Sequence, residues 1–447
     1  MTDPLVRLAG LLDQGSLTVV HGGGATGTTV ALGRVHGVDA IAFCMDAFAA
    51  GADECRHVAD AIDFAVREGR TVIGLWRSGG AGHAGGIEAM DGIGRIFAAT
   101  VRASGTIPQI SVVLGPVAGA AAYGPALTDV VIMAPAGRLS VTRRDAARGV
   151  TGGQIGMEGS GEPETHDREP GVAHIVAGSR EDACVRARRV ASLLAVPGKA
   201  DPDAAAPAED LRALLPASPR RPYDVRPLVT GLLDHDDDGF SFEEFQATWA
   251  PNVVIGLGRL GGQTVGVVAN NLAHKGGRLD LPSAEKAARF VRLCDCMGVP
   301  LLSLIDASGH LPGLGREWSD VVRHGAKLLY AFVEASVPPG LGRHPAAQRQ
   351  RLHRPELALP GRYHGVRLAG YRVRPAGYRV RPAGRRHGGD GRRTGRARPR
   401  PSAARPRGDR RGHRSVTDSG RRGGGVRRRA LPAWSAREHP AVSPGTW

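Results

Sequence analysis

The chain has 447 residues, enough for two or three domains with a large core, and a formal net charge of +16. That charge is unevenly spread. Residues 338–447 hold 28 arginines, no lysine and five acids, for +23, whereas the other residues hold 31 basic and 38 acidic side chains, for −7. The mildly acidic part gives no reason to expect a nucleic-acid partner.

Cysteine usage and hydropathy narrow the class of protein further. The five cysteines form no CxxC pair, which excludes a zinc ribbon and argues against a disulfide framework. No run reaches the ~18 apolar residues needed to span a membrane. Asp3 and Pro4 stand where a signal peptide would need an apolar segment. We therefore expect a cytoplasmic protein with no membrane partner.

Two stretches of the chain predict the same elements in the same order. Residues 31–43, "ALGRVHGVDAIAF", predict a strand, a glycine turn and a second strand, and residues 256–268, "GLGRLGGQTVGVV", predict the same. Each is followed by an amphipathic helix that ends at a glycine, Gly69 or Gly298, where a left-handed cap is easy. Corresponding elements of the two stretches are separated by a nearly constant number of residues, which indicates an internal duplication.

Each copy then predicts a buried strand that runs into a glycine loop and a second helix. The strand-loop segments are "TVIGLWRSGGAGHAGG" (71–86) and "PLLSLIDASGHLPGLG" (300–315). The first copy continues with the strand "IPQISVVLG", the small-residue loop "PVAGAAAYGPALTD" and the strand "VVIMAPAG". The counterpart of this continuation is expected near residue 340.

The composition changes at that point. Beyond Val337 the chain is rich in Arg, Gly, Ala and Pro, the products of CGN, GGN, GCN and CCN codons, and "YRVRPAG" occurs twice in tandem. A GC-rich gene read out of frame yields mostly these residues. A one-base shift also makes "RQRLH" (349–353) compatible with Gly-Ser-Ala-Tyr-Ile. We hypothesise a frameshift between Val337 and Arg343, the alternative being an authentic disordered basic tail.

The glycine loops indicate a chemistry of their own. A strand followed by glycines and a helix start leaves backbone N–H groups unpaired, and such donors stabilise an oxyanion such as a thioester enolate. Gly79 and Gly80 allow a substrate carbonyl to approach closely, and Gly119 and Ala120 offer the same room after the next strand. Either loop alone is also consistent with tight turns and packing.

Other motifs are weaker. "GGGATGTT" (22–29) resembles a P-loop, but Thr28 stands where the lysine is required. "DHDDDGFSFEEF" (234–245) resembles a calcium loop, but Phe245 replaces the bidentate glutamate, so we interpret it as an acidic turn. His83 is an isolated histidine beside the first loop. We predict no metal site.

Six stretches together resemble the carboxyltransferase (beta) subunits of biotin-dependent acyl-CoA carboxylases, of the propionyl-CoA carboxylase type. They are "TVIGLWRSGGAG", "IPQISVVLGPVAGAAAYGPALTD", "EPGVAHIVAGSREDA", "APNVVIGLGRLGGQTVGVVANN", "LDLPSAEKAARFVRLCDCMGVPLLSLIDASGHLPG" and "RHGAKLLYAFVEASVP". The resemblance covers residues 5–337 and implies an α/β fold of tandem crotonase-like (ClpP/crotonase) domains. We expect an N-terminal domain over 1–197, a linker over 198–224, an incomplete C-terminal domain over 225–337, and the out-of-frame or disordered Arg-rich tail over 338–447.

The resemblance also implies a reaction and its participants. The carboxyl of carboxybiotin moves to the α-carbon of an acyl-CoA, of the acetyl- or propionyl-CoA class, and released biotin takes the α-proton. A biotin carboxylase/carrier (alpha) subunit carries the biotin, the beta subunits form a homo-oligomer, and no metal is needed in this subunit. Gly79 and Gly80 correspond to the oxyanion hole for the thioester, with Ala81, Gly119 and Ala120 as substrate-binding candidates. Gly309 and His310, in the second glycine loop, complete the candidate set.

The sequence departs from the family at two places. The family's Arg after Ser-Gly-Gly-Ala is Gly82 here, and the Gly-Ala oxyanion hole expected past Val337, for the biotin ureido oxygen, has no match. We therefore predict weak or no activity for this chain. A biotin-dependent decarboxylase subunit is the nearest alternative. A crotonase-fold hydratase would need carboxylates such as Glu88 and Asp91, and a nucleic-acid-binding function would depend on the tail alone.

Overall fold

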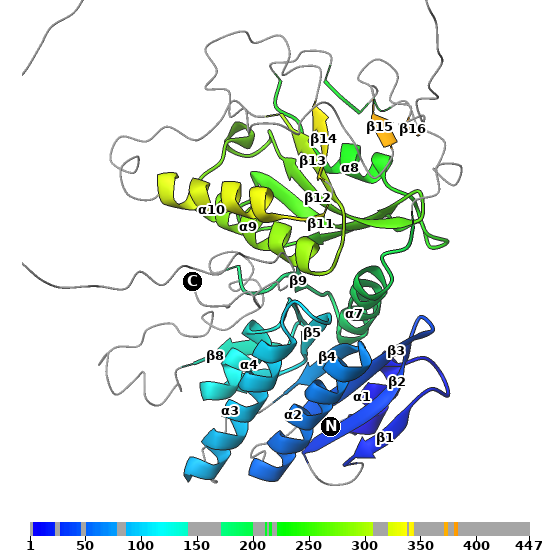
Figure 1. Ribbon diagram of the computed structural model, residues 1–447, viewed down its shortest axis with the longest axis vertical. Helices are drawn as coiled ribbons and strands as arrows, with labels where there is room; N and C mark the ends of the chain where they lie inside the picture. The colour runs from blue at the N-terminus through cyan, green and yellow to red at the C-terminus, as the bar shows by residue number, and fades with distance from the viewer. Residues whose placement is uncertain are drawn as a thin grey trace, which may run out of the picture. The chain divides into compact units, whose positions relative to one another are not determined.

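The structure is a computed structural model that describes residues 3–22, 27–45, 51–77, 86–141, 171–199, 211, 214–216, 221–306, 321–337, 339–343, 371–373 and 380–382. All of them belong to one compact unit, residues 1–383. Its elements form two main sheets, and helices cover them (Figure 1).

The first sheet has seven strands in the order β1-β2-β3-β4-β5-β7-β9. The strands β1, β2 and β3 pair antiparallel, and those from β3 to β9 pair in parallel. Their bounds are β1 Thr18–His21, β2 Thr28–Val35, β3 Val38–Met45, β4 Thr71–Trp76, β5 Gln109–Val113, β7 Val130–Met133 and β9 Ile175–Val176. A separate short parallel pair joins β6 (Pro116–Ala118) and β8 (Arg138–Ser140).

The second sheet has five strands in the order β10-β11-β12-β13-β14. It repeats the first in pairing: β11 and β12 form an antiparallel hairpin, and β12, β13 and β14 follow in parallel. Its strands are β10 Phe242–Phe245, β11 Val253–Leu260, β12 Gln263–Asn270, β13 Leu301–Ile305 and β14 Pro339–Arg343. The two "YRVRPAG" repeats supply a small antiparallel pair, β15 (Tyr371–Val373) and β16 (Val380–Pro382).

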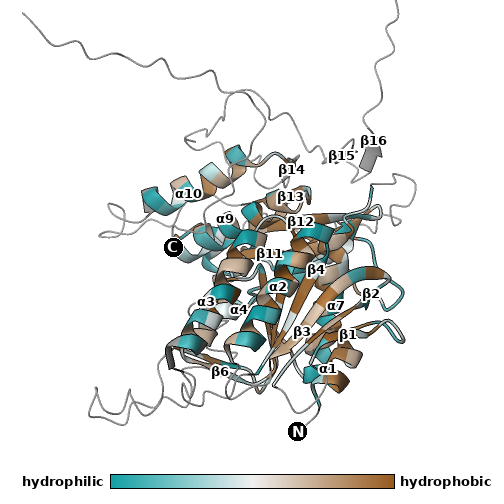
Figure 2. Ribbon diagram, turned by 60° about the horizontal axis from the view of Figure 1, so that its bottom comes forward, coloured by the Kyte–Doolittle hydropathy of each residue, from teal (hydrophilic) through white to brown (hydrophobic). Residues whose placement is uncertain are grey.

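Period-two alternation divides each buried strand between two cores. In β3, Ala40, Ala42 and Cys44 join one buried cluster, and Ile41 and Phe43 join another on the opposite face. The helices α2 (Ala52–Glu68) and α3 (Gly86–Ala103) cover the second face, and α1 (Pro4–Leu11) and α7 (Arg180–Ala195) cover the first. Figure 2 shows the apolar strands and the hydrophilic outward faces of α2 and α3.

Helices cover both faces of the second sheet as well. Apolar residues of α9 (Leu281–Cys296) pack with β11 in the cluster that also contains α7, and α10 (Val321–Glu334) packs against α9. The opposite face is covered by α8 (Arg226–Leu232). The predicted amphipathic faces are confirmed: Val58, Ile62 and Ala65 of α2 are buried, as are Ala287, Phe290, Val291 and Cys294 of α9.

The predicted turns are also confirmed. Gly69 caps α2 in the left-handed conformation, with φ of +64°. Thr28 begins a strand rather than a helix, which a phosphate-binding loop would require. In the acidic turn, Asp236 accepts hydrogen bonds from the backbone N–H groups of Asp238 and Phe240, and β10 follows where an EF-hand would have a helix. The carboxylate of Asp236 is therefore hydrogen-bonded to backbone N–H groups of its own turn.

Buried polar contacts join the first sheet to the second. Glu243 of β10 is 1% exposed, and its carboxylate accepts hydrogen bonds from Arg186 (2.7 Å) and Arg189 (3.2 Å) of α7. Lys286 of α9 is equally buried and donates to the carbonyl oxygens of Gln246 and Trp249, both at 2.8 Å. The connection from β10 to β11 is thereby fixed against both sheets.

Candidate active site

The carboxyl end of β5 leads into a tight turn of small residues. Strand β6 is followed by a 3-10 turn, η1 (Gly119–Ala122), and by a short helix, α4 (Tyr123–Ala126). Gly119 has φ of +67°, a conformation that a residue with a Cβ adopts only at a cost. Gly119 and Ala120 are partly exposed, whereas Ala122 is buried. The structure thus places these two predicted substrate-binding residues where the small-residue loop was expected.

Strand β4, which precedes the first glycine segment in the sequence, is the parallel neighbour of β5 in the sheet. Gly79, Gly80 and Ala81 fall within residues 78–85, as does His83, and these positions lie outside the described residues. The last described residue before them, Arg77, packs its side chain against Gly115, where a Cβ would lie 2.8 Å from the Arg77 Cγ. Carboxyl ends of adjacent parallel strands meet at one edge of a sheet, which is where ligands of open α/β sheets bind.

The side chain that precedes Arg77 was not anticipated from the sequence. Trp76 ends β4 and its indole N–H donates to the Ser111 hydroxyl of β5 at 2.9 Å. The hydroxyl of Thr128, just before β7, lies 3.0 Å from that of Ser111. Only the aromatic residue before a glycine loop could have given a signal in the sequence, since the partners are 35 and 52 positions away.

The second sheet carries a polar cluster at its corresponding edge. Strand β13 ends at Ile305, and the next residue, Asp306, accepts a hydrogen bond from the Tyr223 hydroxyl at 3.0 Å. Tyr223 also accepts, through its carbonyl oxygen, the N–H of Ala273 after β12. Gly309 and His310 lie in residues 307–320, outside the described residues. The segment expected to be a linker therefore ends against the strand that precedes the second glycine loop.

A second carboxylate, Asp224, strengthens this cluster. Its side chain accepts hydrogen bonds from the Asn271 amide (3.1 Å) and from the Arg226 backbone and guanidinium. Burial raises the pKa of Asp224, but these donors and the Arg226 charge outweigh it and hold the pKa below its ordinary value. Asp224 is therefore an ionised anchor for the loop after β12, not a proton donor.

The carboxylates that a hydratase would need are placed poorly for that chemistry. Asp91, in the second turn of α3, forms an exposed ion pair with Arg95 at 2.9 Å. Glu88, in the first turn of the same helix, is exposed. A general acid-base pair needs both groups free to reach one bound substrate. Asp91 is instead engaged by Arg95, and both carboxylates lie on the exposed side of α3.

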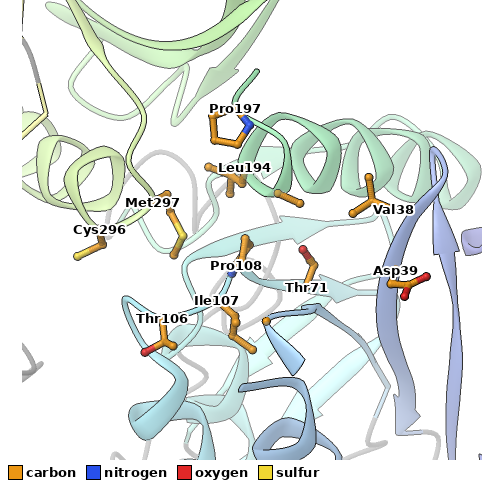
Figure 3. Close-up of a pocket in the computed structure, with 12 residues that line it drawn as sticks. Val38, Asp39, Thr71, Thr106, Ile107, Pro108, Leu194, Pro197, Cys296 and Met297 are labelled. Atoms are coloured by element: carbon orange, nitrogen blue, oxygen red, sulfur yellow. The ribbon is translucent and has the colours of Figure 1, made fainter. Parts of the chain in front are cut away.

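One titratable group and one cavity lie at the opposite, amino ends of the strands. Burial raises the pKa of Asp129, before β7, to about 7, although the N–H of Gln109 and the Arg289 charge oppose it. A cavity of about 240 Å³ opens at the same end, as Thr71 begins β4 and Pro108 precedes β5 (Figure 3). Its lining is Val38, Asp39, Gly69, Thr71, Thr106, Ile107, Pro108, Leu194, Ala195, Pro197, Cys296 and Met297. This cavity does not coincide with the glycine loops.

Within the part of the chain that the structure describes, no group of three or more His, Cys, Asp or Glu side chains is arranged to hold a metal ion. Within the same residues, no helix is long and apolar enough to cross a membrane.

Comparisons with known proteins agree with the sheet arrangement. The family model described as "Carboxyl transferase domain" matches residues 9–339. The chain belongs to this family, the carboxyltransferase subunits of biotin-dependent acyl-CoA carboxylases. It is therefore related to transferases, and the match ends two residues past Val337.

Two relatives are about half identical to the chain over the segments that align. The biotin-dependent acetyl-/propionyl-coenzyme A carboxylase beta6 subunit of Mycobacterium tuberculosis is 51% identical over 341 residues, 75% of this chain and 72% of the relative. The propionyl-CoA carboxylase beta chain of Rhodococcus erythropolis is 52% identical over 341 residues, 75% of this chain and 71% of the relative.

Among solved structures, transcarboxylase 12S with methylmalonyl-coenzyme A and methylmalonic acid bound matches with a TM-score of 0.70. It has 31% identity, and the match covers 77% of this chain and 73% of that one. A single-chain, multi-domain long-chain acyl-CoA carboxylase shares the fold, with a TM-score of 0.66 at 22% identity.

Proposed function

We propose that this carboxyltransferase adds a carboxyl group to the α-carbon of a short acyl-CoA, of the acetyl- or propionyl-CoA class. The observation that carries the proposal is the turn at Gly119, which stands at the carboxyl edge of the first sheet in a chain half identical to acetyl-/propionyl-CoA carboxylase beta subunits. Small residues at this edge leave room for a thioester beside backbone N–H groups.

The catalytic contribution of the first sheet is electrostatic. Removing the α-proton of a thioester leaves negative charge on its carbonyl oxygen, and backbone N–H groups aimed at that oxygen stabilise the enolate. We assign this role to Gly79 and Gly80, with Ala81, Gly119 and Ala120 lining the thioester. Biotin, carried by a partner alpha subunit, supplies the carboxyl group in this chemistry. The second loop, with Gly309 and His310, faces that donor in the proposal.

We further propose that the two sheets are tandem crotonase-like domains. Asp13 follows α1 and accepts the N–H groups of His36 and Gly37 in the β2–β3 turn, while Asp234 follows α8 and accepts those of Gly261 and Gly262 in the β11–β12 turn. The repeated device, beside the repeated strand pairing, supports a common origin. The domain bounds remain those expected from the sequence.

The second domain is incomplete in this proposal. In the first sheet, β5 is followed by the turn that carries Gly119, but the equivalent strand β14 spans the composition change, and the family match ends at residue 339. The Gly-Ala oxyanion hole of the second domain would come from the lost segment. One oxyanion donor contributes about 2.7–4 kcal/mol, on the order of 10² to 10³ in rate, so this chain should be severely impaired.

Self-association is part of the same proposal. Leu329, Tyr330 and Val333 of α10 are exposed, at 37%, 60% and 62%, on a helix whose other face packs on α9. Exposed apolar groups of this kind mark interaction surfaces. The related transcarboxylase 12S is described as a hexamer, which supports a homo-oligomer for this chain too.

The half-reaction without the partner tests the function. Malonyl-CoA or methylmalonyl-CoA is mixed with free biotin, and the acyl-CoA released is measured for the 447-residue chain and for a chain whose reading frame is restored after Val337. We expect the frame-restored chain to transfer the carboxyl group and the 447-residue chain to be at least about 10²-fold slower. Equal rates for the two chains would contradict the impairment, and no transfer by either would contradict the function.

A decarboxylase subunit of the same fold is favoured by one observation, the match to transcarboxylase 12S with methylmalonyl-coenzyme A bound. Carboxyl transfer on one site is reversible, so the partner subunit separates the two. A carboxylase subunit would carboxylate propionyl-CoA from bicarbonate and ATP when its biotin carboxylase/carrier subunit is added to the frame-restored chain, whereas a decarboxylase subunit would not.

A further inference from the structure

The indole of Trp76 occupies a space that two glycines leave open. A Cβ at Gly74 would lie 2.8 Å from the Trp76 Nε1, and a Cβ at Gly124 would lie 2.6 Å from its Cη2. Phe43 packs edge-on against the indole, with 5.4 Å between ring centroids. Trp76 is only 3% exposed. The ring is therefore packed between strand β4 and helix α4, and neither of these elements can move closer to it.

A chain of buried hydrogen bonds leaves the indole and ends on α4. The Trp76 N–H donates to Ser111 at 2.9 Å, the hydroxyls of Ser111 and Thr128 are 3.0 Å apart, and the Thr128 hydroxyl donates to the Pro125 carbonyl oxygen at 2.7 Å. The indole can only donate and the carbonyl can only accept. Each hydroxyl has a single proton, and that of Thr128 is donated to Pro125. Ser111 must therefore donate to Thr128, so the direction of each of these hydrogen bonds is fixed.

This series of hydrogen bonds connects the end of β4 to the η1–α4 turn, the two places from which the proposed thioester-binding segments continue. Trp76 stands three residues before Gly79, and Pro125 belongs to the helix that continues directly from Gly119 and Ala120. Ser111 is fully buried and Thr128 is 8% exposed, so water cannot replace a lost member of the chain without rearrangement.

We propose that Trp76 is a positioning residue for the acyl-CoA thioester: through Ser111 and Thr128, it fixes the η1–α4 turn relative to the carboxyl end of β4. The inference rests on the function proposed above and deepens the same site. Trp76 itself does not touch the substrate in this proposal. Its contribution is to hold the η1–α4 turn so that the small residues on it face the thioester in one fixed arrangement.

The central experiment uses Trp76→Phe, which keeps an aromatic ring against Gly74 and removes the N–H donor. Propionyl-CoA binding to the 447-residue chain is measured by calorimetry, and amide hydrogen exchange is measured over residues 119–128. A lost hydrogen bond of about 0.5–1.5 kcal/mol predicts roughly two- to twelvefold weaker binding, with faster exchange confined to 119–128. Trp249→Phe is the matched control, because Trp249 also packs on a glycine, Gly171, but is not part of the hydrogen bonds that run from Trp76 to Pro125.

A second pair of variants separates positioning from general packing. Thr128→Ser keeps the hydroxyl and should bind propionyl-CoA like the wild type, whereas Thr128→Val keeps the shape, removes the hydroxyl and should reproduce the loss. Gly124→Ala should weaken binding in the wild type but less in Trp76→Phe, because the smaller ring leaves room for the added methyl group. Thr128→Ser and Thr128→Val also test the proposal in place of Trp76→Phe if that variant does not fold.

The outcomes distinguish the two proposals. Wild-type binding and unchanged exchange in both Trp76→Phe and Thr128→Val would overturn the positioning role and leave the function standing. If the wild-type chain binds no propionyl-CoA, the proposed function fails, and the exchange over residues 119–128 still decides whether Trp76 fixes that turn.

Discussion

Asp13 and Asp234 perform one task in the two halves of the molecule. Each donates its own backbone N–H to an arginine carbonyl, that of Arg34 at 2.7 Å or of Arg259 at 2.8 Å, and each carboxylate accepts the two N–H groups of the hairpin turn. The halves diverge after the parallel strands β5 and β14. After β5 the first half adds the turn at Gly119, whereas the second reaches β14 as the sequence changes character.

This difference indicates that the framework of strands and helices and the proposed site depend on separate parts of the sequence. The hairpin, the crossover helix and the buried parallel strand come from local apolar patterns that both halves contain. In the function proposed above, the oxyanion donors come from loops that follow those strands, and the last such loop of the second half has no match in the sequence. The frame alone therefore does not decide whether the proposed chemistry is retained.

The largest effect on stability is expected where the halves meet. Glu243→Gln leaves Arg186 and Arg189 without a buried counter-charge, and both arginines are only a quarter to a third exposed. We expect the free energy of unfolding to fall by about 3 kcal/mol, measured by urea denaturation. The control is Arg292→Gln, which breaks an exposed pair with Glu334 and should cost less than about 1 kcal/mol. Equal losses would mean that Glu243 does not join the halves.

A pH dependence should come from the same junction. His174 precedes β9, its carbonyl oxygen accepts the N–H of Gln246, and its Nδ1 accepts the N–H of Val131. Burial, reinforced by the Arg289 charge, lowers the pKa of His174 to about 3. The unfolded chain takes up a proton below pH ~6.5 but the folded chain does not, so stability falls as the pH is lowered from 6.5 toward 3.

His174 should lower the free energy of unfolding by about 2 kcal/mol at pH 5 relative to pH 7.5. Asp129, whose pKa burial raises to about 7, takes up a proton in the folded chain over the same range and acts in the opposite direction. The contribution of His174 is therefore measured by urea denaturation as the difference between the wild type and His174→Asn, which keeps an acceptor for Val131 and removes the titration. The same pH dependence in the variant would show that another group is responsible.

Removing the hairpin aspartates should affect both halves. Asp234→Ala loses two N–H···carboxylate hydrogen bonds, for about 1.5–2 kcal/mol. Asp13→Ala should cost more, because Asp13 also pairs with Arg188 at 2.7 Å. Thermal unfolding of the two variants checks the order. A smaller loss for Asp13→Ala would mean that the two hairpins are not held alike.

The smallest effect concerns the turn present only in the first half. Gly119→Ala forces a residue with a Cβ into φ of +67°, at about 1 kcal/mol, and a shift of the turn should weaken propionyl-CoA binding roughly fivefold. Gly69→Ala carries the same strain at φ of +64°, at the opposite end of the strands, and should bind like the wild type. Equal weakening by both variants would assign the effect to stability rather than to the site.

Much of the frame was predictable because it depends on contacts close in sequence. The helix that buries Val58 and Ile62, the cap at Gly69 and both hairpins follow from period and glycine alone. The glycine turn at 119 was also placed correctly. The chain from Trp76 to Pro125 could not be foreseen, because it depends on two glycines making room for one ring. The pairing of Tyr223 with Asp306 joins residues 83 positions apart, across a segment expected only to link domains.

The most direct test of the central claim is the nucleotide sequence from the codon of Glu334 onward, read in all three frames. The account predicts that another frame continues with a Val-Thr-Arg-like strand and a Gly-Ala-Tyr loop, which would complete the second half as Gly119 and its turn complete the first. If no frame encodes such a strand and loop, the basic segment is authentic and the claim that the second half has lost its site is wrong.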